Sequence, residues 1–248
     1  RLRPARASTA DMFRREDLTF SWNGGQVVFD GECCAVASLI DTNGRELGPP
    51  GRGPLFGEVI LTRYRTRAEK EAVFPQPIAV TSDLLLRQLE CRLGPTGVEI
   101  RCKFERWGFE VTGTWLFHAD RPWIDMTYRL EGGWTDDPQT TQLAFPLTLS
   151  QPSFRYDAPG AILIAGRRED GGDDLPGANP QLFAGLTFAS ATSGQRSVVL
   201  IAPVTLLLEF GSQAVRAPGY EGKEIPAQIT SMPMMNLTGN DWQFGQAG

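Results

Sequence analysis

The chain has 248 residues and a mass of 27.3 kDa, and 41% of its residues are hydrophobic. This hydrophobic fraction is typical of a folded globular protein and excludes a largely disordered chain. The formal net charge of −5 argues against nucleic acid as a partner, because phosphate recognition requires a concentrated basic face.

The domain organisation is predicted from composition along the chain. The polar segment 1–15 is rich in Arg and Ala and is expected to be flexible, whereas residues 16–248 are expected to form a single domain. The first residue is Arg1 rather than Met, which favours a piece of a longer protein. Apolar runs stay well below the ~20 residues that cross a bilayer, so we expect no membrane partner and a cytoplasmic location.

Short apolar segments joined by turn dipeptides dominate the amino-terminal third. A DG dipeptide at 30–31 separates the apolar residues 27–29 from 33–36, and an NG dipeptide at 43–44 ends the strand predicted at 38–40. Both dipeptides favour tight hairpin turns, because Asp, Asn and Gly tolerate the backbone angles that these turns require. This region is therefore predicted to consist of β-strands.

Strict alternation of apolar and polar residues marks the middle of the chain. It runs through residues 98–105, 109–117 and 124–130. A period of two places one face of a strand on a core and the other in water, so we predict three half-buried strands that form a meander. Gly108 and the DRP tripeptide at 120–122 supply the turns between them.

The last third continues with apolar runs at 182–188, 198–201 and 204–210, which Gly, Pro and Ser separate at short intervals. Only residues 65–72 have a helical composition, which disfavours alternating βαβ units and a parallel sheet. The predicted fold class is therefore all-β with antiparallel strands.

The cysteines predict no disulfide scaffold. The four are Cys33, Cys34, Cys91 and Cys102. They are few, and none belongs to a CxxC pair that would indicate zinc or redox chemistry. We expect free thiols in a reducing cytosol and no cofactor.

Several segments of the second half follow one another in a recognisable order. They are residues 120–133 (DRPWIDMTYRLEGG), 143–147 (LAFPL), 155–160 (RYDAPG), 174–184 (DLPGANPQLFA), 197–203 (SVVLIAP) and, with stretched spacing, 234–242 (MMNLTGNDW). In this order they resemble segments of the carboxy-terminal domain of glycoside hydrolase family 38 α-mannosidases. The resemblance covers residues 119–248, and the first half is similar only in its β character.

This resemblance implies an antiparallel β-supersandwich of the galactose mutarotase-like kind, packed behind a separate catalytic barrel. In the family that barrel carries the nucleophile, the general acid and the zinc ion. The chain has a single histidine, His118, and no counterpart of the family's Asp and His zinc ligands. The resemblance therefore implies no catalytic residue and no metal in this chain, whose partners would be a glycosidase catalytic domain and carbohydrate.

Carbohydrate contacts are expected from aromatic and planar polar side chains in loops, because sugar rings stack on aromatic faces and sugar hydroxyls pair with Arg, Asp and Asn. Trp107, Trp123, Trp134 and Trp242 are nominal contacts, and the last two lie in loop-like sequence. The expected site residues are Trp134, Arg167, Arg168, Asp174, Asn179 and Trp242.

The segment 167–174 has a second interpretation. It places four acidic residues among glycines, and convergent carboxylates on a bendable backbone suit Ca²⁺. Because the segment lacks EF-hand spacing, a simple surface turn is the alternative.

Two other functions stay open beside the non-catalytic one. A mutarotase-like enzyme would use His118 with Glu110, Asp125 or Glu131 in the concave face of the sandwich, because opening a sugar ring moves protons at two oxygens. A structural or assembly module, including a homo-oligomer, would instead expose apolar surface.

Overall fold

The computed structural model describes residues 18–48, 54–64, 77–81, 85–106, 109–132, 139–166, 168, 171–175, 182–201, 207–210, 228–236 and 243–244. These residues form strands and turns, and the strands pair antiparallel, which confirms the predicted all-β class. None of the described segments forms a helix that is long and apolar enough to span a membrane. The segments predicted to be flexible (1–15) and helical in composition (65–72) lie outside the described residues.

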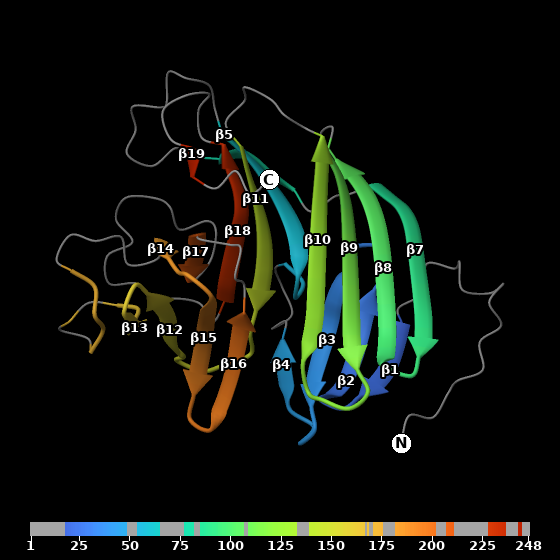
Figure 1. Cartoon of the computed structure of the whole chain (residues 1–248), viewed down its shortest axis with the longest axis horizontal. Coiled ribbons are helices and arrows are strands. Elements are labelled where there is room, and N and C mark those ends of the chain that lie inside the picture. Colours follow the sequence, from blue (N-terminus) through green and yellow to red (C-terminus); the bar gives the residue numbers. More distant parts are fainter. Residues whose placement is uncertain are drawn as a thin grey trace. The chain divides into compact units, whose positions relative to one another are not determined.

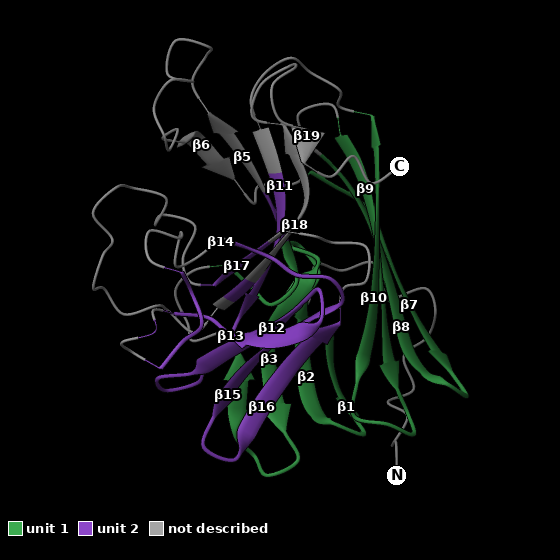
Figure 2. Ribbon diagram, turned by 60° about the vertical axis from the view of Figure 1, so that its left-hand side comes forward, with its two compact units in different colours: residues 1–58, 82–134 green, residues 59–81, 135–248 purple. Residues whose placement is uncertain are grey.

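The chain divides into two compact units, coloured separately in Figure 2. Unit 1 comprises Arg1–Glu58 and Ser82–Trp134, and unit 2 comprises Val59–Thr81 and Thr135–Gly248. The chain therefore passes from one unit to the other three times. The expectation that residues 16–248 form a single domain stays a prediction.

Unit 1 contains two four-stranded antiparallel sheets (Figure 1). The first has the order β1-β2-β3-β4, and the second has the order β10-β9-β8-β7. Their strands are β1 (Leu18–Trp22), β2 (Gly25–Asp30), β3 (Ala35–Asp41), β4 (Glu46–Gly48), β7 (Leu85–Gly94), β8 (Gly97–Arg106), β9 (Phe109–His118) and β10 (Ile124–Gly132). Strands β8, β9 and β10 form the predicted meander.

The two sheets of unit 1 pack face to face through aromatic side chains. Phe29 of β2 meets Trp115 of β9 edge to face at 5.4 Å, and Phe20 of β1 meets Phe117 of β9 at 4.9 Å. Phe29, Trp115 and Phe117 are fully buried. In β8, β9 and β10 the alternation that predicted the strands thus separates an apolar inner face from a polar outer face.

Side-chain hydrogen bonds shape the turns of unit 1. The carboxylate of Asp30 accepts hydrogen bonds from the backbone of Glu32 at 2.7 Å and of Cys33 at 2.9 Å, which folds the turn between β2 and β3. Gly44, at a φ of 75°, allows the turn between β3 and β4. Turns form at both dipeptides and each spans four residues, so Cys33 and Cys34, expected to follow the first turn, belong to it.

Unit 2 is built from a large sheet and a four-stranded sheet. The large sheet has the order β14-β17-β18-β11-β5-β6 with β19 beside β18, and the smaller sheet has the order β13-β12-β15-β16. The strands are β5 (Glu58–Tyr64), β6 (Pro77–Thr81), β11 (Gln139–Pro146), β12 (Ser153–Ala158), β13 (Ala161–Ile164), β14 (Leu182–Ala184), β15 (Phe188–Ser193), β16 (Arg196–Ile201), β17 (Leu207–Phe210), β18 (Gln228–Asn236) and β19 (Gln243–Phe244).

An aromatic cluster joins the two sheets of unit 2. Phe154 of β12 stacks on Phe210 of β17 at 4.8 Å, and Tyr156 of β12 contacts Phe183 of β14 at the same distance. All four side chains are buried. These contacts give unit 2 an apolar core of its own.

The apolar run predicted as one segment at 182–188 splits into two strands. β14 ends at Ala184, and β15 begins at Phe188 in the other sheet. Gly185 stands between them, where an added Cβ would lie 2.6 Å from a methyl carbon of Leu208. The close approach at Gly185 and the change of sheet explain why the run is not a single strand.

Candidate functional site

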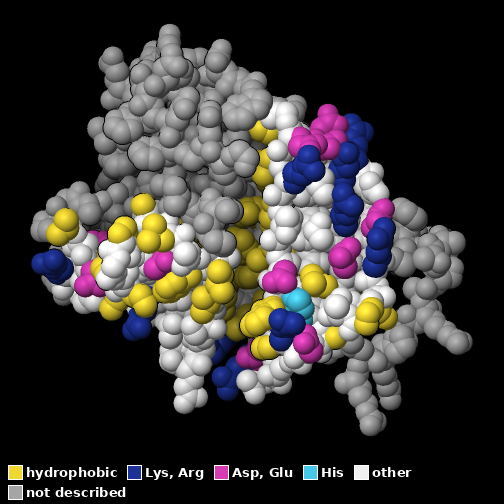
Figure 3. Space-filling view, viewed as in Figure 1, with side chains coloured by type: hydrophobic (Ala, Val, Ile, Leu, Met, Phe, Trp, Pro, Cys, Tyr) yellow, Lys and Arg dark blue, Asp and Glu magenta, His cyan; other side chains and the backbone are white. Residues whose placement is uncertain are grey.

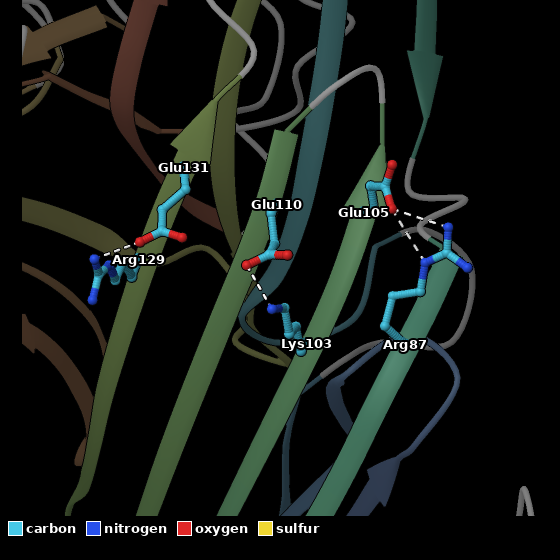
Figure 4. A network of polar contacts seen from close by, with 6 residues as sticks. All are labelled: Arg87, Lys103, Glu105, Glu110, Arg129 and Glu131. Carbon is cyan, nitrogen blue, oxygen red and sulfur yellow. Dashed lines mark hydrogen bonds and ion pairs between the residues drawn. The ribbon is translucent and has the colours of Figure 1, made fainter.

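The outer face of the β7–β10 sheet carries a network of charged side chains (Figure 4). Glu105, Glu110 and Glu131 stand at matching register positions on three adjacent strands, where their like charges repel. Each is paired with a neighbouring cation, in the ion pairs Arg87–Glu105 at 3.0 Å, Lys103–Glu110 at 2.7 Å and Arg129–Glu131 at 2.5 Å. Because these pairs are solvent-exposed, the network is better explained as a balanced surface than as a binding site.

A second set of side chains, four polar and one aromatic, gathers at the opposite end of this sheet, around the β9–β10 loop. We call this set the loop cluster; its members are His118, Asp120, Arg121, Trp123 and Asp125. In Figure 3 the single histidine of the chain, in cyan, lies among hydrophobic, basic and acidic side chains. The loop cluster is therefore a surface on which aromatic, cationic and anionic groups meet.

Trp123 is the exposed aromatic side chain of the loop cluster. It is 53% exposed, although tryptophan side chains are highly buried on average. The His118 ring meets it edge to face at 6.3 Å, and the guanidinium of Arg121 lies 5.0 Å from its ring centre. These two contacts orient the indole and leave about half of its surface to solvent.

Two carboxylates bind the side chains that contact Trp123. Asp125 Oδ2 lies 2.6 Å from His118 Nε2, and Asp120 Oδ1 accepts a hydrogen bond from Arg121 Nε at 3.1 Å. The hydrogen bond from Arg121 lowers the pKa of Asp120, so that this carboxylate keeps its charge to a more acidic pH than an unpaired aspartate. The loop cluster thus offers oriented acceptors beside an aromatic surface, the groups that hydrogen-bond and stack on a polyhydroxylated ring.

Antiparallel register brings His118 and Asp125 together. Ile124 pairs with Phe117 and Asp125 pairs with Leu116, so Asp125 is the diagonal neighbour of His118 on the outer face. The His118 side chain is only 9% exposed, whereas the Asp125 side chain is 65% exposed. Spacing in the sequence did not select a carboxylate for His118, but the register of a hairpin turning at 119–122 would have selected Asp125.

Glu110 and Glu131, the other two carboxylates considered for His118, lie far from it. They pair with each other in register at the far end of β9 and β10. His118 follows Glu110 by eight residues, a separation of about 26 Å along an extended strand. Neither carboxylate shares a site with His118 in this structure.

Most of the carbohydrate-binding residues predicted from the sequence lie outside the described residues. These are Trp134, Arg167, Asn179 and Trp242. Of the other two, Arg168 is exposed and Asp174 is half-buried. The predicted set therefore stays a prediction, while Trp123, named only as a nominal contact, lies within the loop cluster.

Asp173 and Asp174 close a backbone loop against β13. Asp173 accepts a hydrogen bond from the Ile164 amide at 2.8 Å, and Asp174 accepts one from the Gly166 amide at 2.9 Å. Burial raises the pKa of Asp174. Within the described ranges, no three His, Cys, Asp or Glu side chains group in a way that could hold a metal ion.

The carboxylate of Asp157, in the RYDAPG segment, anchors the start of β15. It accepts hydrogen bonds from the amides of Leu186, Thr187 and Phe188 at 2.9 to 3.0 Å. Desolvation alone would raise the pKa of Asp157, but these bonds and one from the Thr187 hydroxyl hold it well below its ordinary value. The hydrogen-bonding capacity of the Asp157 carboxylate is thus used within the fold, and we do not assign it to ligand binding.

Comparison with known proteins assigns no family to the chain. No protein-family model matches it, and no curated protein matches it. The candidate site is therefore interpreted from its own residues and geometry.

Proposed function

We propose that the chain is a non-catalytic β-sandwich module that binds carbohydrate at the loop cluster and supports a glycosidase catalytic domain. The observation that carries the proposal is the exposed indole of Trp123 beside the oriented carboxylates of Asp120 and Asp125. The ordered resemblance of residues 119–248 to the α-mannosidase carboxy-terminal domain supports the link to a glycosidase. The finer fold that goes with this proposal is the galactose mutarotase-like supersandwich.

The chemistry of the loop cluster favours a neutral, polyhydroxylated ligand. The indole offers a flat apolar surface for the C–H groups of a sugar ring, and the carboxylates accept hydrogen bonds from hydroxyls. Because the charges of Arg121 and Asp120 offset each other, this ion pair does not favour a charged ligand over a neutral one. Asp125, held by His118, loses little side-chain freedom when it binds a hydroxyl, which reduces the entropic cost of binding.

The proposal predicts that Trp123→Ala weakens carbohydrate binding by about tenfold or more, because it removes the stacking surface. The measurement is calorimetric titration of the full chain with mannose, mannobiose and galactose. Trp123→Phe, which retains an aromatic ring, should lose less affinity. Arg87→Ala is the matched control, because Arg87 belongs to the charged network at the other end of the sheet and should leave binding unchanged.

Two outcomes would contradict this assignment. If no sugar gives saturable heat at millimolar concentration, carbohydrate binding by the chain is wrong. If sugar binds equally well to the wild type and to Trp123→Ala, the loop cluster is the wrong site, and Trp134 and Trp242 become the residues to test.

The contact between His118 and Asp125 favours a second candidate function, a mutarotase-like sugar enzyme. A carboxylate that holds an imidazole at 2.6 Å sets its orientation, as acid–base catalysis requires. The test follows the optical rotation of freshly dissolved α-galactose with wild-type chain and with His118→Gln. A rate equal to that of buffer, or equal rates for both proteins, removes this candidate.

A further inference from the structure

Among the described strands, β16 lies at one end of the smaller sheet of unit 2, beside β15 (Figure 1). Its sequence is RSVVLI, so residues 198–201 are apolar without interruption. A continuous apolar run is typical of a strand with both faces buried, whereas edge strands commonly carry charged residues or proline. The sequence of β16 therefore suits a position inside a sheet, although the strand lies at an edge.

Both faces of β16 leave apolar side chains incompletely covered. Val198 and Leu200 share the face on which Phe154 packs against the large sheet, and both are half-buried. Val199 and Ile201 lie on the opposite face and are 56% and 73% exposed. Further burial is therefore favourable on either face, because removing apolar surface from water drives association.

The edge of β16 also presents backbone groups. In an antiparallel pair, alternate residues direct their N–H and C=O groups away from the partner strand. Within the part of the chain that the structure describes, residues 197–201 make no backbone hydrogen bond apart from the ladder with β15. A further strand that pairs with this edge would use these groups and cover apolar side chains on both faces.

Other described edge strands carry features that oppose such pairing. Strand β7 contains three charged residues and a bulge. At the other edge of the smaller sheet, Asp173 hydrogen-bonds with the backbone of Ile164 in β13. Strand β16, by contrast, keeps a regular register with β15, and its one charged residue, Arg196, stands at its first position. It therefore lacks the devices that keep edge strands apart.

We propose that β16 of a second copy of the chain pairs antiparallel with this edge, around a two-fold axis near Val199, and joins the two four-stranded sheets into one. An antiparallel copy of β16 places apolar residues opposite apolar residues on both faces, so the edge is self-complementary. Charge does not oppose the pairing. The two copies of Arg196 would lie about 20 Å apart along the paired strands, beyond the screening length of about 8 Å at physiological salt.

The size of the contact predicts a weak dimer. Six extended residues span about 20 Å, and a sheet edge with its side chains is about 15 Å thick, so the pairing buries on the order of 600 Å² in total. Stable interfaces bury about 1,200 Å² or more, so we expect a dissociation constant of about 10–100 µM. Because a two-fold contact uses each β16 edge once, assembly stops at the dimer.

Sedimentation equilibrium of the full chain between about 5 and 300 µM tests the proposal. We expect the average mass to rise from that of the 27.3 kDa monomer toward that of a dimer and no further. Val199→Lys and Val199→Glu should each stay monomeric, because each places like charges opposite each other at the axis. An equimolar mixture of the two variants should regain the dimer, because opposite charges then face each other.

Two control variants separate edge pairing from other contacts. Leu93→Lys is the matched control, because Leu93 is 58% exposed on the charged edge strand β7, and this variant should dimerise like the wild type. Ile162→Lys changes an exposed residue of β13, at the far side of the sheet from β16, and should also keep the dimer. Circular dichroism checks that each variant is folded.

Amide hydrogen exchange of the wild type tests the same contact without any substitution. Protection of residues 197–201 should rise with protein concentration, whereas that of β7 should not. The proposal is overturned by a wild type that stays monomeric at about 300 µM or assembles beyond a dimer. It is equally overturned by a mixture of the two Val199 variants that stays monomeric, or by a dimer that Ile162→Lys abolishes and Val199→Lys retains. A monomeric wild type would leave this edge to a strand of another protein.

Discussion

Trp115→Ala is expected to lower the free energy of unfolding by about 3–5 kcal/mol, the range for removing a large aromatic side chain from a packed core. Trp115 has no exposed surface and meets three aromatic rings within unit 1. Phe29 lies 5.4 Å away edge to face, and Phe117 and Tyr128 each lie 6.1 Å away. The substitution therefore removes contacts in several directions at once.

The backbone around Trp115 limits how far the cavity can collapse. Gly57 has a φ of 78°, and a Cβ on it would lie 2.1 Å from the ring of Trp115, so the indole rests directly on backbone. The Tyr128 hydroxyl donates a hydrogen bond to the Gly57 carbonyl at 2.7 Å, which holds that backbone in place. If the surrounding residues cannot move into the cavity, most of the stability lost by creating it is not recovered. We therefore expect a loss of unfolding free energy in the upper part of this range.

Urea unfolding followed by far-ultraviolet circular dichroism measures the effect of Trp115→Ala. Trp123→Ala is the matched control, because it removes the same side chain from an exposed position and should change stability by less than about 1 kcal/mol. Equal losses for the two variants would contradict the assignment of Trp115 to the centre of the unit 1 core.

The strands of unit 1 could be predicted because each has one face in the core and one in water. The segments predicted at 98–105 and 109–117 correspond to β8 and β9, whose buried residues alternate with half-buried or exposed ones. Gly and Asp favour turns through their own backbone conformations and short-range hydrogen bonds, so the positions of the turns can also be predicted from the local sequence. Local patterns of this kind identify strands but not their partners.

The partners of the strands depend on contacts that no local pattern contains. Strand β5 lies directly after unit 1 residues in the chain, yet it joins the large sheet of unit 2 next to β11. The loop cluster was predicted only in part, for a related reason. His118, Trp123 and Asp125 were named as separate candidates, but Asp125 could be chosen as the partner of His118 only from the register of β9 and β10. Side-chain chemistry in a β protein follows from register, which requires the paired strand.

Asp157→Asn is expected to lower the free energy of unfolding at pH 7 by about 1–2 kcal/mol, because the charged acceptor for three amides and one hydroxyl becomes a neutral amide. Asp157 is only half-buried, so water can replace part of these hydrogen bonds, which limits the loss. Asp173→Asn is the control, and its loss should be smaller, because Asp173 accepts a hydrogen bond from the Ile164 amide alone among the bonds described for its side chain.

The pH dependence of this effect has a definite sign. The pKa of Asp157 is lower in the folded chain than in the unfolded chain, so its stabilising contribution is complete above the unfolded value of about 4. As the pH falls below that value, the unfolded chain takes up the proton first, and the contribution is lost progressively toward the lower folded pKa. The wild type and Asp157→Asn should therefore differ most near pH 7 and converge in acid.

Two optical signals make the Asp157→Asn experiment a test of domain organisation as well. Five of the six tryptophans lie in unit 1, whereas Asp157 lies in unit 2. Since the chain passes between the units three times, we expect one cooperative transition, with tryptophan fluorescence and circular dichroism shifted equally by the substitution. A fluorescence transition that stays at the wild-type midpoint while the dichroism transition moves would show that unit 1 unfolds independently, and would contradict a single domain over residues 16–248.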